Sequence, residues 1–147
     1  MHKVEKYISE FRSILHDMVP SCSVRSDGNS LHIAFRTEAG VISIKVKFYI
    51  QSIHAMLCHS GSVHPDCREQ AADRFCRLNR YLDEYMAYRF SESGGPILTA
   101  IYDTSYDDPV RDAGLPEFCH LLVRTAPVAL DRVIEEFSVL QIRNNET

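Results

Sequence analysis

The sequence contains no long hydrophobic run. Its most apolar stretch, residues 41–50, is interrupted by Lys45 and Lys47. It is far shorter than the roughly 20 apolar residues that a membrane-spanning helix needs. The first residues contain no continuous apolar segment of the kind that a secretory signal carries. We therefore expect a cytoplasmic protein that does not enter membranes.

Basic residues are not in excess. Sixteen Lys and Arg stand against 20 Asp and Glu, which gives a formal net charge of −4. Binding to a phosphate backbone relies on a basic surface, so this balance disfavours nucleic acid and favours protein partners. With 147 residues, 45% of them hydrophobic and 24% charged, the chain has the size and composition of a single globular domain over residues 1–147.

The cysteines are spread widely along the chain, and their count is odd. The five thiols are Cys22, Cys58, Cys67, Cys76 and Cys119. A secreted disulfide framework is denser and usually has an even number of cysteines. We therefore expect free thiols in a reducing compartment, most of them acting as small buried hydrophobic side chains.

Recognisable catalytic motifs are missing as well. No serine lies in a nucleophile elbow, and no cysteine has a recognisable catalytic context. The pair Gly94-Gly95 lies between two predicted strands and indicates a hairpin turn instead of a phosphate-binding loop. Asp103, Asp107 and Asp108 lack the spacing of a calcium loop, so a solvated loop is favoured. We therefore expect a protein that is not an enzyme.

Helical periodicity occurs in three segments. Apolar residues recur at steps of three and four over residues 4–18, 65–82 and 116–140. Pro20 ends the first helix, and Pro65 suits the first position of the second. Pro127 lies inside the third segment, where it is expected to kink or divide the helix.

Alternating apolar residues predict the strands. They cover residues 22–26, 31–36, 41–58, 86–90 and 97–101. After Ile50 the apolar positions change from even to odd numbers, which requires a turn or a bulge near Gln51 and Ser52. Residues 41–58 are therefore either two strands or one kinked strand.

The resulting order of elements is α-β-β-β-α-β-β-α. Strands that follow one another in hairpin-like runs favour an antiparallel sheet, here of about five strands, with helices packed on it. The sequence thus predicts an α+β fold.

This order resembles that of the YbjN family and of the type III secretion chaperones, which share a fold. The most suggestive stretch is a helix from Pro65 that ends in Arg-Leu-Asn-Arg-Tyr at residues 77–81. Residues 85–90, a short glycine turn and residues 97–102 then form a two-stranded meander before a long apolar helix.

The resemblance implies a small, often dimeric binding protein and supplies no catalytic residues. The secretion chaperones hold an extended segment of a partner along the domain, and YbjN-like proteins are described as regulators of sensory transduction. We therefore expect a non-enzymatic, chaperone-like or regulatory homodimer that binds a protein or peptide segment, with the exposed half of the sheet and the first helix as contact surfaces.

Five of the seven tyrosines lie in the second half of the chain. They are Tyr81, Tyr85, Tyr88, Tyr102 and Tyr106. Tyrosine supplies a large contact area with a polar tip, which suits an interface, but it also packs well within sheets. Both interpretations stay open.

One cluster has the residue types of a metal site, namely Cys58, His59, His64 and Cys67. Zinc favours thiolates and imidazoles in a tetrahedron. The spacing is not a recognised zinc pattern, however, and adjacent side chains on a strand point to opposite faces. Core thiols and loop imidazoles are the favoured interpretation. The alternative is a small zinc-binding or redox-sensing protein that uses these four residues. His54 and His120, beside apolar residues, are expected to be ordinary core or edge histidines.

Overall fold

The computed structural model describes residues 2–37, 40–61, 63–80, 86–90, 96–103 and 114–146. Within these residues the strands are β1 (Ser23–Asp27), β2 (Ser30–Arg36), β3 (Val41–Phe48), β4 (Ser52–His59), β5 (Met86–Phe90) and β6 (Pro96–Asp103). They form one antiparallel sheet in the order β1-β2-β3-β4-β6-β5.

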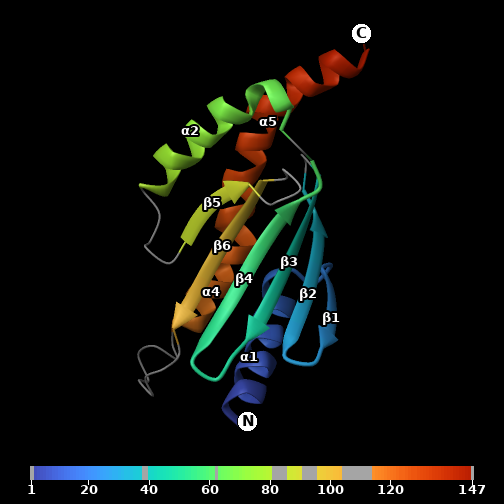
Figure 1. Cartoon of the computed structure of the whole chain (residues 1–147). Coiled ribbons are helices and arrows are strands. Elements are labelled where there is room, and N and C mark those ends of the chain that lie inside the picture. The colour runs from blue at the N-terminus through green and yellow to red at the C-terminus, as the bar shows by residue number, and fades with distance from the viewer. Residues whose placement is uncertain are drawn as a thin grey trace.

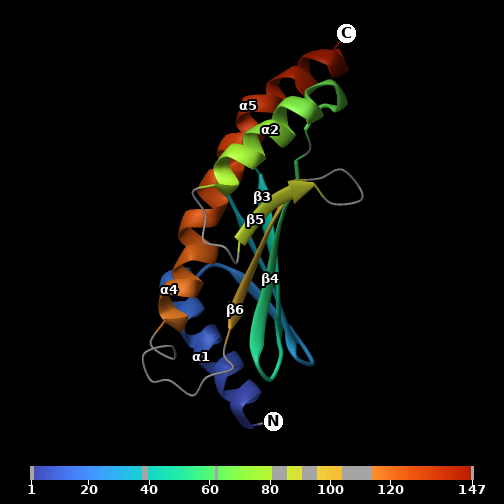
Figure 2. The ribbon, with the colours of Figure 1, turned by 60° about the vertical axis from the view of Figure 1, so that its left-hand side comes forward.

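The helices cover one face of this sheet (Figures 1 and 2). They are α1 (His2–Met18), α2 (Arg68–Asn79), α4 (Leu115–His120) and α5 (Ala126–Glu146). A 3-10 turn at Pro65–Cys67 leads into α2, and a π-helical turn at Leu121–Thr125 joins α4 to α5. The predicted α+β class, with an antiparallel sheet and helices packed on it, is confirmed.

Residues 41–58 belong to two strands, so the described part of the sheet has six strands instead of about five. Four strands, not three, precede α2. Phe48 pairs with Ile53, and the N–H of Tyr49 donates to the carbonyl of Ser52 over 2.8 Å. Because an even-numbered residue of β3 pairs with an odd-numbered residue of β4, their apolar side chains share one face. The change of the apolar positions from even to odd numbers in the sequence therefore reflects this hairpin.

The first helix buries its apolar stripe within the chain. Val4, Tyr7, Phe11 and Leu15 are all buried. The ring of Phe11 meets that of Phe48 edge to face, with 5.7 Å between centroids. Burying a side chain of this size contributes about 1.5–3 kcal/mol. The apolar stripe of α1 is therefore not available to a partner, although the helix was expected to be a contact surface.

Pro127 disturbs the last helix as predicted, and it does so through a π-helical turn. The N–H of Ala126 bonds to the carbonyl of Leu121, five residues earlier. A proline in a regular α-helix clashes with the carbonyl four residues before it, here that of Val123. Widening the preceding turn relieves that crowding, and the helical path continues into α5.

Several predicted features lie outside the described residues. They are the glycine turn at residues 91–95, residues 104–113 of the predicted polar loop, and Leu82 at the end of the second apolar stripe.

Candidate functional site

The face of the sheet opposite the helices has no described element packed on it (Figure 2). We call its exposed and half-buried side chains on β1 to β4 the open sheet face: Ser23, Arg25, Asp27, His32, Ala34, Arg36, Val41, Ser43, Lys45, Lys47, Ser52, His54, Met56 and Cys58. Strand pairing sets them in rows. Lys45 lies between His32 and Met56, and Lys47 pairs with His54.

A shallow depression of about 360 Å³ lies in this face. Ala34, Met56 and Cys58, which are half-buried, line it. Arg25 and Lys45, which are exposed, line it as well, with Lys45 between His32 and Met56. The depression thus combines a small apolar surface with two cations.

The open sheet face is positive although the whole chain is negative. Arg25, Lys45 and Lys47 are exposed, and the ammonium of Lys47 lies 5.3 Å from the ring centroid of Tyr49. Among the described side chains that share this face, the only carboxylate is that of Asp27, at the end of β1. The surface charge therefore suits an acidic partner.

The four residues of the predicted metal site are not brought together. Cys58 lies on the open sheet face, whereas His59 points into the opposite, helix-covered side and is buried. The Nδ1 atom of His64 accepts the N–H of Asp66 at the start of the 3-10 turn, and Cys67 is buried beneath α2. Within the described residues, no three His, Cys, Asp or Glu side chains are grouped so as to hold a metal ion.

His59 is instead the centre of a hydrogen-bond network. Gly61 donates its N–H to Nδ1 over 2.8 Å, and Nε2 lies 3.0 Å from Oδ1 of Asp131 on α5. The hydroxyl of Thr37 shares its proton between the carbonyl of Gly40, over 2.8 Å, and this carboxylate, over 3.2 Å. Because Nδ1 accepts, the ring carries its proton on Nε2 and donates it to Asp131. With both nitrogens engaged, His59 has no free nitrogen for proton transfer and acts as a structural connector.

The five cysteines are free thiols, as predicted. Only Cys67 and Cys119 are fully buried, while Cys22 and Cys58 are half-buried and Cys76 is exposed. Burial raises the pKa of the Cys58 thiol. It also raises the pKa of Cys119, to about 12, with a smaller contribution from the nearby Cys22. Raised pKa values keep Cys58 and Cys119 protonated near neutral pH, which disfavours them as nucleophiles.

The tyrosines and acidic residues singled out in the sequence lie mostly beyond what the structure describes. Tyr102 is half-buried, and its ring packs on Phe118 with 5.2 Å between centroids, so this tyrosine belongs to the sheet packing. The remaining members lie outside the described residues or side chains: Tyr81, Tyr85, Tyr88, Tyr106, Asp103, Asp107 and Asp108.

The two isolated histidines are exposed. Nε2 of His54 lies 2.9 Å from the hydroxyl of Ser52, and its ring stacks edge to face on Tyr49. His54 is therefore an edge histidine of the β3–β4 hairpin, and His120 lies on the outer side of α4.

Comparisons with known proteins and structures found no relative of this chain. No family model, no curated protein and no solved structure matches the chain. In the part of the chain that the structure describes, no helix has the length and apolar character to cross a membrane. The surfaces must therefore be interpreted from their own chemistry.

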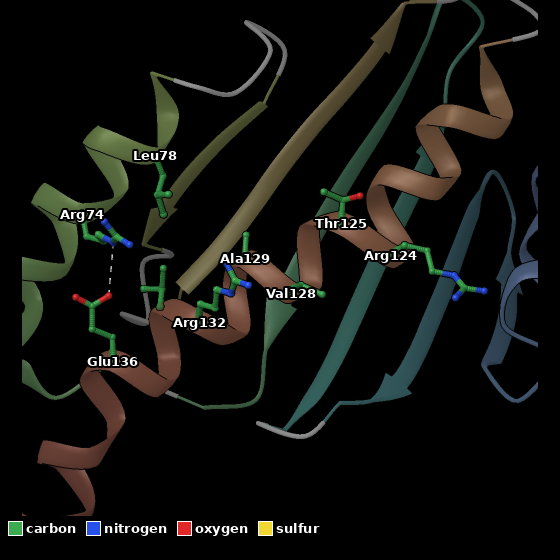
Figure 3. A pocket seen from close by; sticks show the side chains of 9 residues that line it. Arg74, Leu78, Arg124, Thr125, Val128, Ala129, Arg132 and Glu136 are labelled. Atoms are coloured by element: carbon green, nitrogen blue, oxygen red, sulfur yellow. Dashed lines mark ion pairs between the residues drawn. The ribbon is translucent and has the colours of Figure 1, made fainter.

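A second concave surface was not predicted from the sequence. A groove of about 380 Å³ lies between α2 and α5, and arginines from both helices line it (Figure 3). These arginines occupy the polar positions of amphipathic helices, which usually indicate a solvated surface. Only the packing of α2 beside α5 brings them together.

Proposed function

We propose that this chain is a non-enzymatic protein-binding domain, chaperone-like or regulatory, that captures an acidic segment of a partner on the open sheet face. The observation that supports it best is a sheet with helices on one face and none of the described elements on the other. Exposed apolar surface that is rimmed by polar or charged side chains often marks a site of protein interaction.

The binding energy would come from two sources. Contact with the half-buried Ala34, Met56 and Cys58 removes apolar area from water, at about 25 cal/mol per Å². Carboxylates of the partner would lie near Arg25, Lys45 and Lys47. Exposed ion pairs contribute little affinity each, but complementary charge accelerates association and selects the partner.

We also propose that the domain acts as a homodimer, following the resemblance to small dimeric binding proteins. Exposed apolar side chains on the β3–β4 turn support an association surface, since Ile50 is 68% exposed and Tyr49 is 42% exposed. Light scattering at micromolar concentration tests this proposal, and a monomer there would contradict it.

The binding proposal is tested by site-specific photo-crosslinking in the source cell. A photoreactive amino acid replaces Met56 on the open sheet face, and in a matched control it replaces Glu69, an exposed residue of α2. We expect a discrete crosslinked partner from position 56, absent from position 69, with the crosslink in an acidic segment. Equal labelling from both positions, or a crosslink in a neutral or basic segment, would contradict the proposal.

A further inference from the structure

The groove between α2 and α5 has the size and lining of a small-molecule site. Its volume is about 380 Å³, and such sites commonly span roughly 300–1,000 Å³. α2 contributes Arg74 and Leu78, and the π-helical turn and α5 contribute the other described lining residues. The groove belongs to the helical side of the molecule, so it is separate from the open sheet face.

The floor of the groove is apolar. Leu78 comes from α2, and Val128, Ala129 and Val133 come from α5. Val133 is buried, whereas Val128 is 52% exposed, which is unusual for a large aliphatic side chain on this protein. An aliphatic ligand lying along α5 would cover this exposed surface.

Two arginines approach the groove from opposite walls, Arg74 from α2 and Arg132 from α5 (Figure 3). Arg124, at the other end, extends away from them and donates to the carbonyl of Met18. Among the described lining residues the only carboxylate is that of Glu136. The groove is thus cationic in a chain of net charge −4.

The contact between Arg74 and Glu136 leaves a donor unsatisfied. Nε of Arg74 lies 3.5 Å from Oε2 of Glu136, yet this nitrogen is shielded from solvent and makes no hydrogen bond. The Arg74 side chain as a whole is 43% exposed, so an anionic oxygen would approach the guanidinium from its exposed side and add the charge-assisted hydrogen bond that Glu136 does not make. Glu136 thus neutralises part of the charge at Arg74 without satisfying its donor.

We infer that this groove binds a small amphiphilic anion. Its carboxylate or phosphate head would accept hydrogen bonds from Arg74 and Arg132, which suit such groups because the guanidinium presents several donors in a fixed plane. Its aliphatic body would lie over Leu78, Ala129 and Val128. From Arg124 to Glu136 the helical path is about 18 Å long at 1.5 Å per residue, enough for an extended chain of about ten carbons.

Calorimetric titration of the full chain with decanoate, decyl phosphate and decanol tests this inference. We expect saturable binding of at least one of the two anions, with decanol weaker by about tenfold or more because it lacks the charge-assisted hydrogen bonds. The tighter of the two anions identifies the head group. Decanol binding as tightly as the anions, or no saturable binding of either anion, would overturn the inference.

Variants locate the site. Arg74→Gln and Arg132→Gln should each weaken anion binding by about tenfold, because each removes a charge-assisted hydrogen bond to the head. Lys6→Gln removes an exposed cation from α1, outside the groove and outside the open sheet face, and serves as the matched control, with unchanged affinity expected. Circular dichroism checks that each variant is folded. An equal loss of anion affinity in all three variants would indicate that positive charge attracts the anion without a specific site, and would contradict the proposed site.

Glu136→Gln provides a test in the opposite direction. It removes the carboxylate that competes for Arg74 and that repels an incoming anion, so the affinity for the anion should increase. An unchanged or lower affinity would show that the head group does not lie at Arg74.

Discussion

His59 on β4 and Asp131 on α5 are joined by a hydrogen bond of 3.0 Å between Nε2 and Oδ1, across 72 positions of sequence. The imidazole is fully shielded from solvent, while the carboxylate side chain is 17% exposed. Together with the bond from Gly61 to Nδ1, this contact ties the end of a central strand to the long helix. It is a buried polar connection within a largely apolar core.

Asp131→Ala should destabilise the fold, because it leaves the buried Nε2–H of His59 without its acceptor, whereas the hydroxyl of Thr37 keeps the carbonyl of Gly40. An unsatisfied buried donor costs about 1–3 kcal/mol. Asp131→Asn keeps one oxygen acceptor and should cost less. Urea unfolding measures both changes in the free energy of unfolding.

The control for this comparison is Asp66→Ala. Asp66 has a side chain that is 87% exposed, and its loss should change stability by no more than about 0.5 kcal/mol. Equal effects of Asp131→Ala and Asp66→Ala would show that the buried contact contributes nothing to stability.

The His59 network also shows where prediction from the sequence ends. Alternation placed Ile42, Ile44 and Val46 on one face of β3 with the lysines opposite, and the structure agrees. Local periodicity cannot reveal that His59 meets Asp131, because that contact depends on how α5 crosses the sheet. The sequence therefore grouped His59 with its neighbour Cys58, although strand geometry separates the two side chains.

The number of strands and the arginine-lined groove could not be predicted from the sequence, because neither has a clear local signal. The turn between β3 and β4 contains Tyr49 and Ile50 and has no Gly or Pro, so only the parity of the apolar residues marked it. Arg74 and Arg132 each occupy an ordinary polar position of a helix. That both line one groove becomes apparent only when α2 packs beside α5 (Figure 3).

Gly40→Ala should destabilise the protein more than Gly28→Ala. Gly40 has φ +154°, and a Cβ there would lie 2.8 Å from Oγ of Ser60 and 2.9 Å from Cε1 of His59. Gly28 has φ +58°, with nothing within 4 Å of the added atom. Backbone strain alone predicts a loss of about 1 kcal/mol at Gly28. Strain and crowding together predict about 3 kcal/mol at Gly40.

Thermal and urea unfolding of the two alanine variants measure this difference. Gly28→Ala is the control for backbone strain, because it places alanine at a positive φ where the added Cβ contacts no other atom. Equal losses of unfolding free energy in the two variants would contradict this prediction. They would show that the β2–β3 turn adjusts to the added Cβ without a loss of stability, so that His59 and Ser60 do not restrict position 40.

Stability should fall as pH rises above about 9, in part through Cys119. Burial raises the pKa of its thiol from 9.0 to about 12 in the folded protein. Between these values the unfolded chain releases a proton that the folded chain retains, so rising pH favours unfolding. One such group contributes a slope of about 1.4 kcal/mol per pH unit at most.

Comparison with Cys119→Ala isolates this contribution from the other groups that titrate in alkali. The variant loses stability at every pH because it truncates a buried side chain, but its stability should decline less steeply between pH 9 and 12. Parallel curves of unfolding free energy for the two proteins would show that Cys119 does not titrate differently in the two states.

Purified protein should contain no stoichiometric zinc. His59 already uses both ring nitrogens, and Cys58 and His59 lie on opposite faces of β4. Elemental analysis after purification without chelators provides the measurement. One zinc per chain that is lost in Cys67→Ser would establish the metal-binding alternative and show that these residues rearrange around the ion.

Reversing a charge on the open sheet face should weaken partner binding without unfolding the protein. Lys45 and Lys47 are exposed, so Lys45→Glu and Lys47→Glu should each change stability by no more than about 0.5 kcal/mol. Once crosslinking has identified the acidic segment, a peptide of that segment serves as the ligand. Its association rate should fall in each variant and depend less on salt, because charge complementarity acts mainly on association.

Lys6→Glu is the matched control for the change in net charge. Lys6 lies on α1, beside Glu10 at 4.0 Å, and is remote from the open sheet face. The same reversal there alters the total charge equally but leaves the proposed contact surface intact, so the association rate should stay close to that of the unaltered protein. If Lys6→Glu slows association as much as Lys45→Glu does, net charge alone governs the encounter and the open sheet face is not the binding surface.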